Sequence, residues 1–177
     1  IEGENDKYKS INGILFNKTE NEIISYPCGK PETKYIVPDS VVTIKKESFR
    51  GNKFLQTILI QDNVKTFEEN SFAYCSSLST FYYLGKEIKS ETVVFKGTET
   101  LSKISVRQDY GESTKFYDKD IEKVGNNCGT NVWYLLFEEN TYLYIYGNGI
   151  MSNFTTKEEQ PWKDYRSIIK KIRMDEV

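Results

Sequence analysis

The chain repeats itself with a period of 23 residues, and this period constrains its fold more than any other feature. The segment 36–44 (IVPDSVVTI) aligns with the segment 59–67 (LIQDNVKTF) at this offset. Identical residues occupy Asp39/Asp62, Val41/Val64, Thr43/Thr66, Ser48/Ser71, Phe49/Phe72, Leu55/Leu78 and Thr57/Thr80. A third, degenerate copy loses the V-x-T-I half but extends two columns to Phe95 and Leu101. Because regular periods of this length come from stacked structural units, we expect a solenoid.

Each copy contains a short segment with the alternation of a β-strand. Within residues 55–61 (LQTILIQ), Ile58 and Ile60 share one face while polar residues and Leu59 share the other. One such strand cannot bury its apolar face alone, whereas copies stacked about 4.8 Å apart form a continuous core. We therefore expect parallel strands near 57–60, 80–83 and 103–106. The alternative, chance similarity between two hairpins, is disfavoured by the columns that keep one offset through three copies.

The two clearest repeats resemble BspA-like leucine-rich repeats, whose pattern is I-P-x-x-V-x-x-I-x-x-x-A-F-x-x-C-x-x-L-x-x-I. The matching positions are Pro38, Val41, Ile44, Phe49, Leu55 and the C-x-x-L segment Cys75–Leu78. Asn52 departs from the pattern where cysteine is usual, and Gln61 departs where proline is usual. The resemblance implies a mainly β fold with short helical turns, built as a leucine-rich-repeat solenoid with β-hairpin caps.

The resemblance also divides the chain into segments. We expect an N-terminal cap hairpin over 1–34, three repeats over 35–107 (35–58, 59–81 and 82–107), a linker over 108–127 and a second cap over 128–177. The linker is predicted from its polar, aperiodic sequence. The second cap contains two predicted strands, 132–137 and 142–146, and resembles the cap that opens a further repeat array. Its tyrosine row, Tyr142, Tyr144 and Tyr146, is expected to serve in packing the cap against the repeats rather than in ligand binding.

The composition excludes several classes of function. There is no histidine, so Ser-His or Cys-His catalysis and histidine metal sites are impossible. Lys and Arg number 24 against 26 Asp and Glu, and this net charge of −2 disfavours nucleic-acid binding. The three cysteines, Cys28, Cys75 and Cys128, have no metal-ligand spacing, so we expect no metal or cofactor and predict buried free thiols. The longest apolar run, 132–137, is too short to cross a membrane.

Adjacent acidic pairs offer the one enzymatic alternative, a carbohydrate-active enzyme that uses two carboxylates. The pairs are Glu68/Glu69, Glu138/Glu139 and Glu158/Glu159. Neighbouring residues on a strand point to opposite faces, so they cannot flank one glycosidic bond. We therefore interpret them as solvated charges and expect no enzymatic activity.

The outward positions of the three strands form the candidate ligand-binding face. The period places them in three rows, namely Thr57/Thr80/Lys103, Leu59/Tyr82/Ser105 and Gln61/Leu84/Arg107. We expect all nine side chains to be exposed together, with an apolar centre and two cations at one end. This chemistry favours an anionic glycan or an acidic protein patch, with Tyr82 as the expected anchor.

The family resemblance implies a non-enzymatic, virulence-associated adhesion module at the cell surface or in a secreted protein. Its expected partners are protein or glycan ligands on a host cell or matrix, with possible self-association. The alternative to an adhesion module is a structural spacer within a longer surface protein, which binds no ligand itself. Two sequons, at Asn17 and Asn153, are candidate glycosylation sites.

Overall fold

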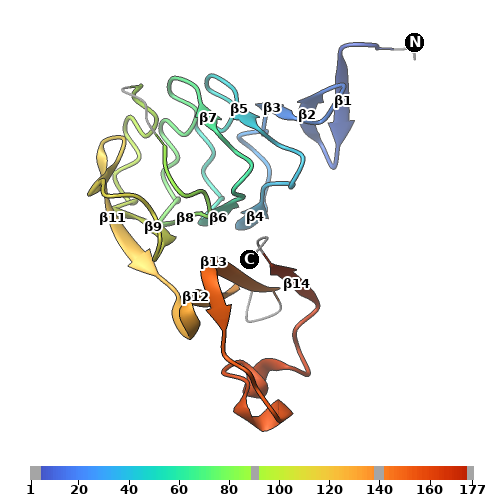
Figure 1. Cartoon of the computed structure of the whole chain (residues 1–177). Coiled ribbons are helices and arrows are strands. Elements are labelled where there is room, and N and C mark those ends of the chain that lie inside the picture. Colours follow the sequence, from blue (N-terminus) through green and yellow to red (C-terminus); the bar gives the residue numbers. More distant parts are fainter. Residues whose placement is uncertain (1–4, 89–91, 138–141, 175–177) are drawn as a thin grey trace. The chain divides into compact units, whose positions relative to one another are not determined.

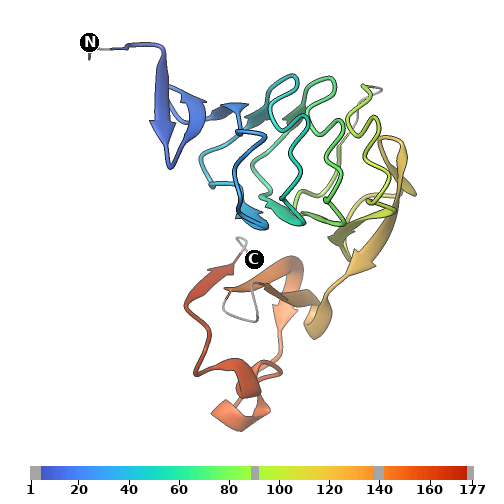
Figure 2. The same cartoon turned by 180° about the vertical axis from the view of Figure 1, so that it is seen from behind.

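A computed structural model describes residues 5–88, 92–137 and 142–174 of the chain. The chain divides into two compact units, Ile1–Lys123 and Val124–Val177, and each is described by itself (Figures 1 and 2). The described residues are dominated by strands, with helix confined to two 3-10 turns in the second unit, η1 (Lys157–Glu159) and η2 (Lys163–Tyr165). No helix in the described part of the chain is long and apolar enough to cross a membrane.

The first unit begins with a cap that leads directly into the repeats. Strands β1 (Tyr8–Ile11), β2 (Ile14–Asn17) and β3 (Glu22–Ser25) pair antiparallel. The short strands β5 (Thr43–Ile44) and β7 (Thr66–Phe67), which come from the V-x-T-I halves of the repeats, then add in parallel. The sheet order is β1-β2-β3-β5-β7. The cap therefore provides the edge on which the first repeat strand is built.

The second sheet carries the predicted repeat strands. These are β6 (Thr57–Ile60), β8 (Thr80–Tyr83) and β9 (Lys103–Arg107), and they pair in parallel as expected. The register aligns Thr57 with Thr80 and Tyr82 with Ser105, which confirms the 23-residue offset. An additional strand, β4 (Lys34–Ile36), pairs in parallel with β6 and adds a layer before the first predicted one.

The segment 108–127, which we predicted to be a linker, contains two strands. A hairpin of β10 (Lys115–Phe116) and β11 (Lys119–Val124) extends the sheet to the order β10-β11-β9-β8-β6-β4. The hairpin is anchored by Phe116, which is buried and whose ring contacts those of Phe81, Tyr83 and Phe95. Phe116, together with Tyr110 and Tyr117 of the same polar stretch, therefore closes the end of the repeat core.

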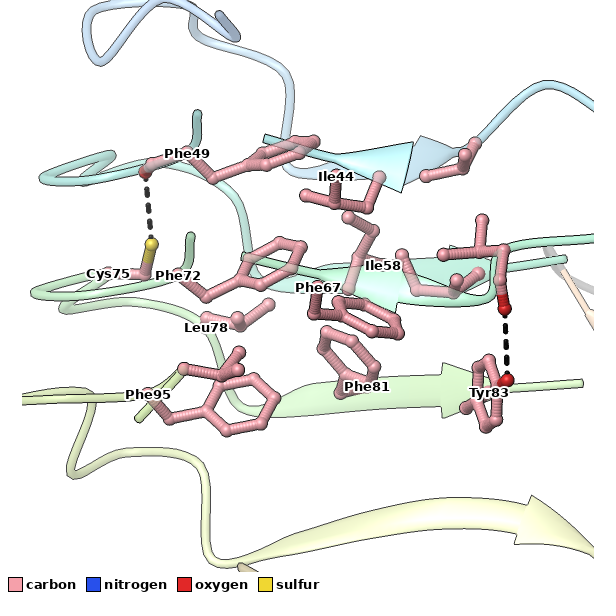
Figure 3. Close-up of a cluster of buried hydrophobic side chains, with 14 of the residues drawn as sticks. Ile44, Phe49, Ile58, Phe67, Phe72, Cys75, Leu78, Phe81, Tyr83 and Phe95 are labelled. Carbon is pink, nitrogen blue, oxygen red and sulfur yellow. Dashed lines mark hydrogen bonds between the residues drawn. The ribbon is translucent and has the colours of Figure 1, made fainter. Parts of the chain in front are cut away.

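The core between the two sheets contains the predicted phenylalanine column (Figure 3). The rings of Phe49 and Phe72 stack at 4.6 Å between centroids, and Phe72 and Phe95 stack at 5.9 Å. Tyr26 stacks on Phe49 at 4.9 Å and extends the column into the cap. Phe72, the middle ring of the column, is fully buried.

A second column, of polar side chains, ties successive layers together at the offset of 23 residues. The side chains of Asn52, Cys75 and Thr98 each donate a hydrogen bond to a main-chain carbonyl about one layer earlier in the chain, those of Pro27, Phe49 and Phe72. Asn52 also accepts hydrogen bonds from the backbone N–H groups of residues 54 and 55. The asparagine that departs from the family pattern thus makes the same kind of contact as the cysteine it replaces.

The second unit is a three-stranded sheet with the order β12-β13-β14. Strands β12 (Asn126–Phe137) and β13 (Tyr142–Met151) form an antiparallel hairpin, and both are longer than the segments predicted from the sequence. Strand β14 (Lys171–Met174) adds in parallel to β13. Trp162, on the loop that carries the 3-10 turns, packs against Tyr134 and Phe154 and closes the core of this unit.

Candidate ligand-binding face

The face of sheet β4-β6-β8-β9 opposite the core brings the predicted rows together. Inward-pointing residues such as Ile58 and Phe81 join the core cluster, and the residues between them point outward. Because the strands pair in parallel and in register, equivalent outward residues lie side by side on neighbouring strands. The alignment of the first two rows is therefore the alignment predicted from the period.

The first row presents two hydroxyl groups between two cations. Lys34 pairs with Thr57 and Thr57 pairs with Thr80 in the strand register, and Lys103 opens the next strand. The two lysines are exposed and the two threonines are half-buried. Lys34 lies on the layer that the sequence did not reveal, so this row is longer than predicted.

The second row contains the expected anchor, Tyr82, which pairs with Leu59 on one side and Ser105 on the other. Tyr82 is half-buried, and burial, with Glu122 nearby, raises the pKa of its hydroxyl. Ser105 donates a hydrogen bond of 3.0 Å to the carboxylate of Glu122 on β11. A negative charge on the β10–β11 hairpin, that of Glu122, therefore lies beside Tyr82. The repeat pattern in the sequence did not indicate this charge.

The prediction that all nine side chains are exposed is wrong. Five of them are buried: Leu59, Gln61, Leu84, Ser105 and Arg107. Leu59 lies between Ile36 and Tyr82 on a central strand, and Ser105 lies beneath the contact with Glu122. The accessible part of the predicted face is therefore Thr57, Thr80, Tyr82 and Lys103.

Arg107 departs most from its predicted role as an exposed cation. Its Nε and Nη2 atoms donate to the two carboxylate oxygens of Asp109 at 2.7 and 2.8 Å, and Nη1 donates to the carbonyl of Leu84 at 3.3 Å. Its side chain is 1% exposed. Arg107 thus acts as a buried clamp, because its bond to the Leu84 carbonyl joins the last two repeat layers. Its positive charge is balanced by the carboxylate of Asp109, two residues along the chain.

The acidic pairs do not form a catalytic arrangement in the described residues. Glu68 contacts Lys45, Glu69 contacts Lys46 and Glu158 contacts Arg166. The pKa of the Glu69 carboxyl is lowered by its hydrogen bond to Lys46, whereas the general acid of a glycosidase needs a raised pKa. The third pair, Glu138/Glu139, lies outside the described residues.

The cysteines are all free thiols, but only two of them are buried. Cys75 and Cys128 are buried as expected, whereas Cys28 is exposed, contrary to expectation. Burial raises the pKa of the Cys75 thiol to about 12 and that of Cys128 to about 11. Within the described residues, no group of His, Cys, Asp and Glu could hold a metal ion.

The tyrosine row of the second unit has cationic neighbours on the same face of its own sheet. Lys171 and Arg173 of β14 pair with Tyr142 and Tyr144 of β13. The Lys171 Nζ atom lies 5.0 Å from the Tyr142 ring centre, and the Arg173 guanidinium lies 5.9 Å from that of Tyr144. Residues 171–174 (KIRM) alternate between cationic and apolar side chains, and this alternation is the sequence signal that could have indicated the pairing.

Comparison with known proteins places these features in a class, the leucine-rich-repeat proteins built from stacked parallel strands. The family model described as the BspA type leucine rich repeat region (6 copies) matches residues 21–133. The chain belongs to this family. No curated protein matches the chain.

Three solved structures of bacterial proteins are similar to the chain. A leucine-rich cell surface protein from Faecalibacterium prausnitzii is 20% identical, with a TM-score of 0.44 over 59% of this chain and 34% of its own. A leucine-rich repeat protein from Eubacterium ventriosum is 22% identical, with a TM-score of 0.45 over 58% and 34%. The pneumococcal vaccine antigen PcpA is 19% identical, with a TM-score of 0.46 over 99% and 49%. The chain thus spans between a third and a half of these proteins.

Proposed function

We propose that the chain is a non-enzymatic recognition module of a cell-surface or secreted protein. Its ligand is a protein or glycan of a host cell or matrix, held on the face that carries Thr57, Thr80, Tyr82 and Lys103. Membership in the BspA type family supports the surface location, because the resemblance implies it. The observation that carries the binding proposal is the in-register alignment of outward side chains on parallel strands.

The chemistry of this face favours a ligand with acidic and hydroxyl groups. The exposed ends of the first row are lysines, and the threonines between them can donate and accept hydrogen bonds. Tyr82 adds a ring with a polar tip, the type of side chain that dominates binding hot spots. Glu122 beside Tyr82 opposes a ligand whose negative charge covers the whole face. The acidic groups of the ligand are therefore expected at the lysines, away from the β11 edge.

The rival functions make different demands on the structure. A two-carboxylate enzyme needs one acid with a raised pKa, and the acids that pair with lysines here have lowered pKa values. A structural spacer needs no particular side chains on this face. This function therefore predicts that the side chains of the face can be replaced without loss of binding.

The direct test is binding of the purified chain to immobilised matrix proteins and to carboxylated and sulfated glycans. We expect Tyr82→Ala and Lys103→Glu each to weaken binding to the captured ligand at least about fivefold. Tyr74→Ala is the matched control, because Tyr74 is an exposed tyrosine of the neighbouring repeat, 59–81, on a turn outside this face. Equal binding by all three folded variants would contradict the recognition face and favour the spacer.

A further inference from the structure

The tip of the β1–β2 hairpin carries an asparagine–glycine pair that the proposed recognition function does not use. Asn12 and Gly13 are the two residues between Ile11 and Ile14, which pair in the strand register. Their φ angles are positive, 50° and 78°, as a type I′ turn requires. The hairpin presents this pair to solvent, whereas the other Asn-Gly pair of the sequence, at 148–149, lies inside strand β13.

An asparagine that precedes a glycine can react with its own backbone. The glycine nitrogen loses its proton to a base in solvent and forms a bond to the asparagine Cγ atom. The bond from Cγ to Nδ2 breaks, and Nδ2 leaves as ammonia. Water then opens the resulting five-membered succinimide ring, giving aspartate by attack at Cγ or isoaspartate by attack at the main-chain carbonyl carbon. Glycine favours the first step because it has no Cβ atom to hinder the approach.

Both reacting groups of the hairpin tip are free of competing contacts. Within the described part of the chain, neither the side-chain amide of Asn12 nor the N–H of Gly13 makes a hydrogen bond to the protein. Apart from the chain neighbours, no heavy atom lies within 4 Å of the position that a Cβ atom on Gly13 would occupy. The amide of Asn17, by contrast, is held by Thr19 and Asn21. Asn12 can therefore turn its amide toward the Gly13 nitrogen.

A lysine contacts the peptide group whose nitrogen must react. The Lys30 Nζ atom donates a hydrogen bond of 2.9 Å to the main-chain carbonyl oxygen of Asn12, and it lies 2.6 Å from the Glu32 carboxylate. Only 15% of the Lys30 side chain is exposed. When the Gly13 nitrogen loses its proton, amide resonance shares the negative charge with this carbonyl oxygen. A cation that is already bonded to the oxygen stabilises the reactive anion.

We propose that Asn12 is a self-modifying site, at which Lys30 accelerates succinimide formation and thereby the conversion of Asn12 to aspartate and isoaspartate. Glu32 positions the ammonium group, and water is the only other reactant. Isoaspartate adds one carbon atom to the main chain of a two-residue turn, so the pairing of Ile11 with Ile14 is lost. Because β1 is the first strand in the order β1-β2-β3-β5-β7, the modification loosens this edge strand and leaves the other four in place.

The test is to age the full chain at pH 8 and physiological temperature and to follow each asparagine by mass spectrometry of proteolytic peptides. We expect Lys30→Met to slow the deamidation of Asn12 at least about fivefold, and Lys30→Arg, which keeps a cationic donor, to slow it less. Lys18→Met is the matched control, because Lys18 also donates to a main-chain carbonyl of the cap, that of Asn5. Its rate at Asn12 should stay within about twofold of the parent rate.

Loss of folding cannot imitate the expected result, because a loosened turn would speed up deamidation rather than slow it. Equal or faster deamidation of Asn12 in Lys30→Met would overturn the role of Lys30, and an Asn12 that stays intact in the parent chain would overturn the site itself. Two-dimensional ¹H–¹⁵N NMR tests the structural consequence. The amide signals of Tyr8–Ile11 should shift as isoaspartate accumulates, and unchanged signals would overturn the loosening of β1.

Discussion

The Sγ atom of Cys75 donates a hydrogen bond to the carbonyl oxygen of Phe49, 3.1 Å away in the preceding repeat (Figure 3). Burial raises the pKa of this thiol to about 12, so the thiol stays protonated at neutral pH. At pH 8 we therefore expect one fast-reacting thiol, Cys28, when the native chain is treated with a thiol-specific reagent. Cys75 and Cys128 should react only in denaturant. Labelling followed by mass spectrometry identifies the sites, and rapid native labelling of Cys75 would contradict the layer-to-layer contact.

Phe72 is the central ring of the phenylalanine column, so its removal should damage the core most. Phe72→Ala is expected to lower the free energy of unfolding by about 3–5 kcal/mol. Phe54 is 44% exposed and gives the matched control, Phe54→Ala, for which we expect a change within about 0.5 kcal/mol. Urea unfolding followed by circular dichroism measures both. Tryptophan fluorescence is unsuitable here, because both tryptophans, Trp133 and Trp162, lie in the second unit.

Arg107 should contribute to stability rather than to ligand binding, in contrast to its predicted role. Arg107→Ala removes the paired hydrogen bonds to Asp109 and the bond to Leu84, and we expect a loss of about 2–4 kcal/mol in unfolding free energy. Asp109→Ala should also destabilise, because it leaves a buried guanidinium without its carboxylate. The double variant should lose less than the sum of the two single losses. Additive losses in the urea unfolding experiment would contradict the clamp.

The columns of the repeat were predictable because each depends on one offset and one alternation. The buried positions of Phe72 and Cys75 and the register of Thr57 with Thr80 follow from these two regularities alone. The interior of a solenoid repeats at every layer, so a period in the sequence carries over directly to a column in space.

The ends of the stack could not be predicted in the same way, because there the period stops. Arg107 aligns with Gln61 and Leu84, yet its partner Asp109 exists only in the last layer. Likewise, Phe116 covers the core from a polar stretch that has no repeat equivalent. Exposure on the outward face depends on such non-repeating neighbours, and alternation only says which face a residue occupies.

The charge ladder over Glu22, Lys45 and Glu68 should make stability depend on pH in the acid range. Lys45 lies 2.6 Å from Glu68 and 3.9 Å from Glu22. Burial alone would raise the pKa of Glu68, but hydrogen bonds from Lys45 and from the Lys46 backbone outweigh it and hold the pKa below the usual 4.5. A lowered pKa in the folded state means that the stabilisation is present above pH 4.5 and disappears as the pH falls through the folded value.

Replacement of the central lysine tests this ladder. We expect Lys45→Met to lower the unfolding free energy by about 0.5 kcal/mol at pH 7, since the partners are about a third exposed. The difference from the parent chain should vanish once the pH falls below the folded-state pKa of Glu68, because the carboxyl is then protonated in both the folded and the unfolded states. Lys46→Met, which breaks the more exposed pair with Glu69, is the control and should show a smaller effect. A constant difference across the pH range would contradict the ladder.

The two sequons should behave differently when the chain is expressed in a eukaryotic secretory system. The Asn17 side chain donates to Thr19 and Asn21 and accepts from the Glu22 backbone N–H, so its amide is held within the β2–β3 turn. Asn153 is exposed after the end of β13. We therefore expect glycan on Asn153 and little or none on Asn17, because transfer requires an accessible amide nitrogen on a surface loop. Glycopeptide mass spectrometry measures the occupancy of each site. On a denaturing gel, Asn153→Gln should abolish the mass increase caused by the glycan, and Asn17→Gln should preserve it. Full occupancy of Asn17 would contradict the prediction that the β2–β3 turn shields its amide.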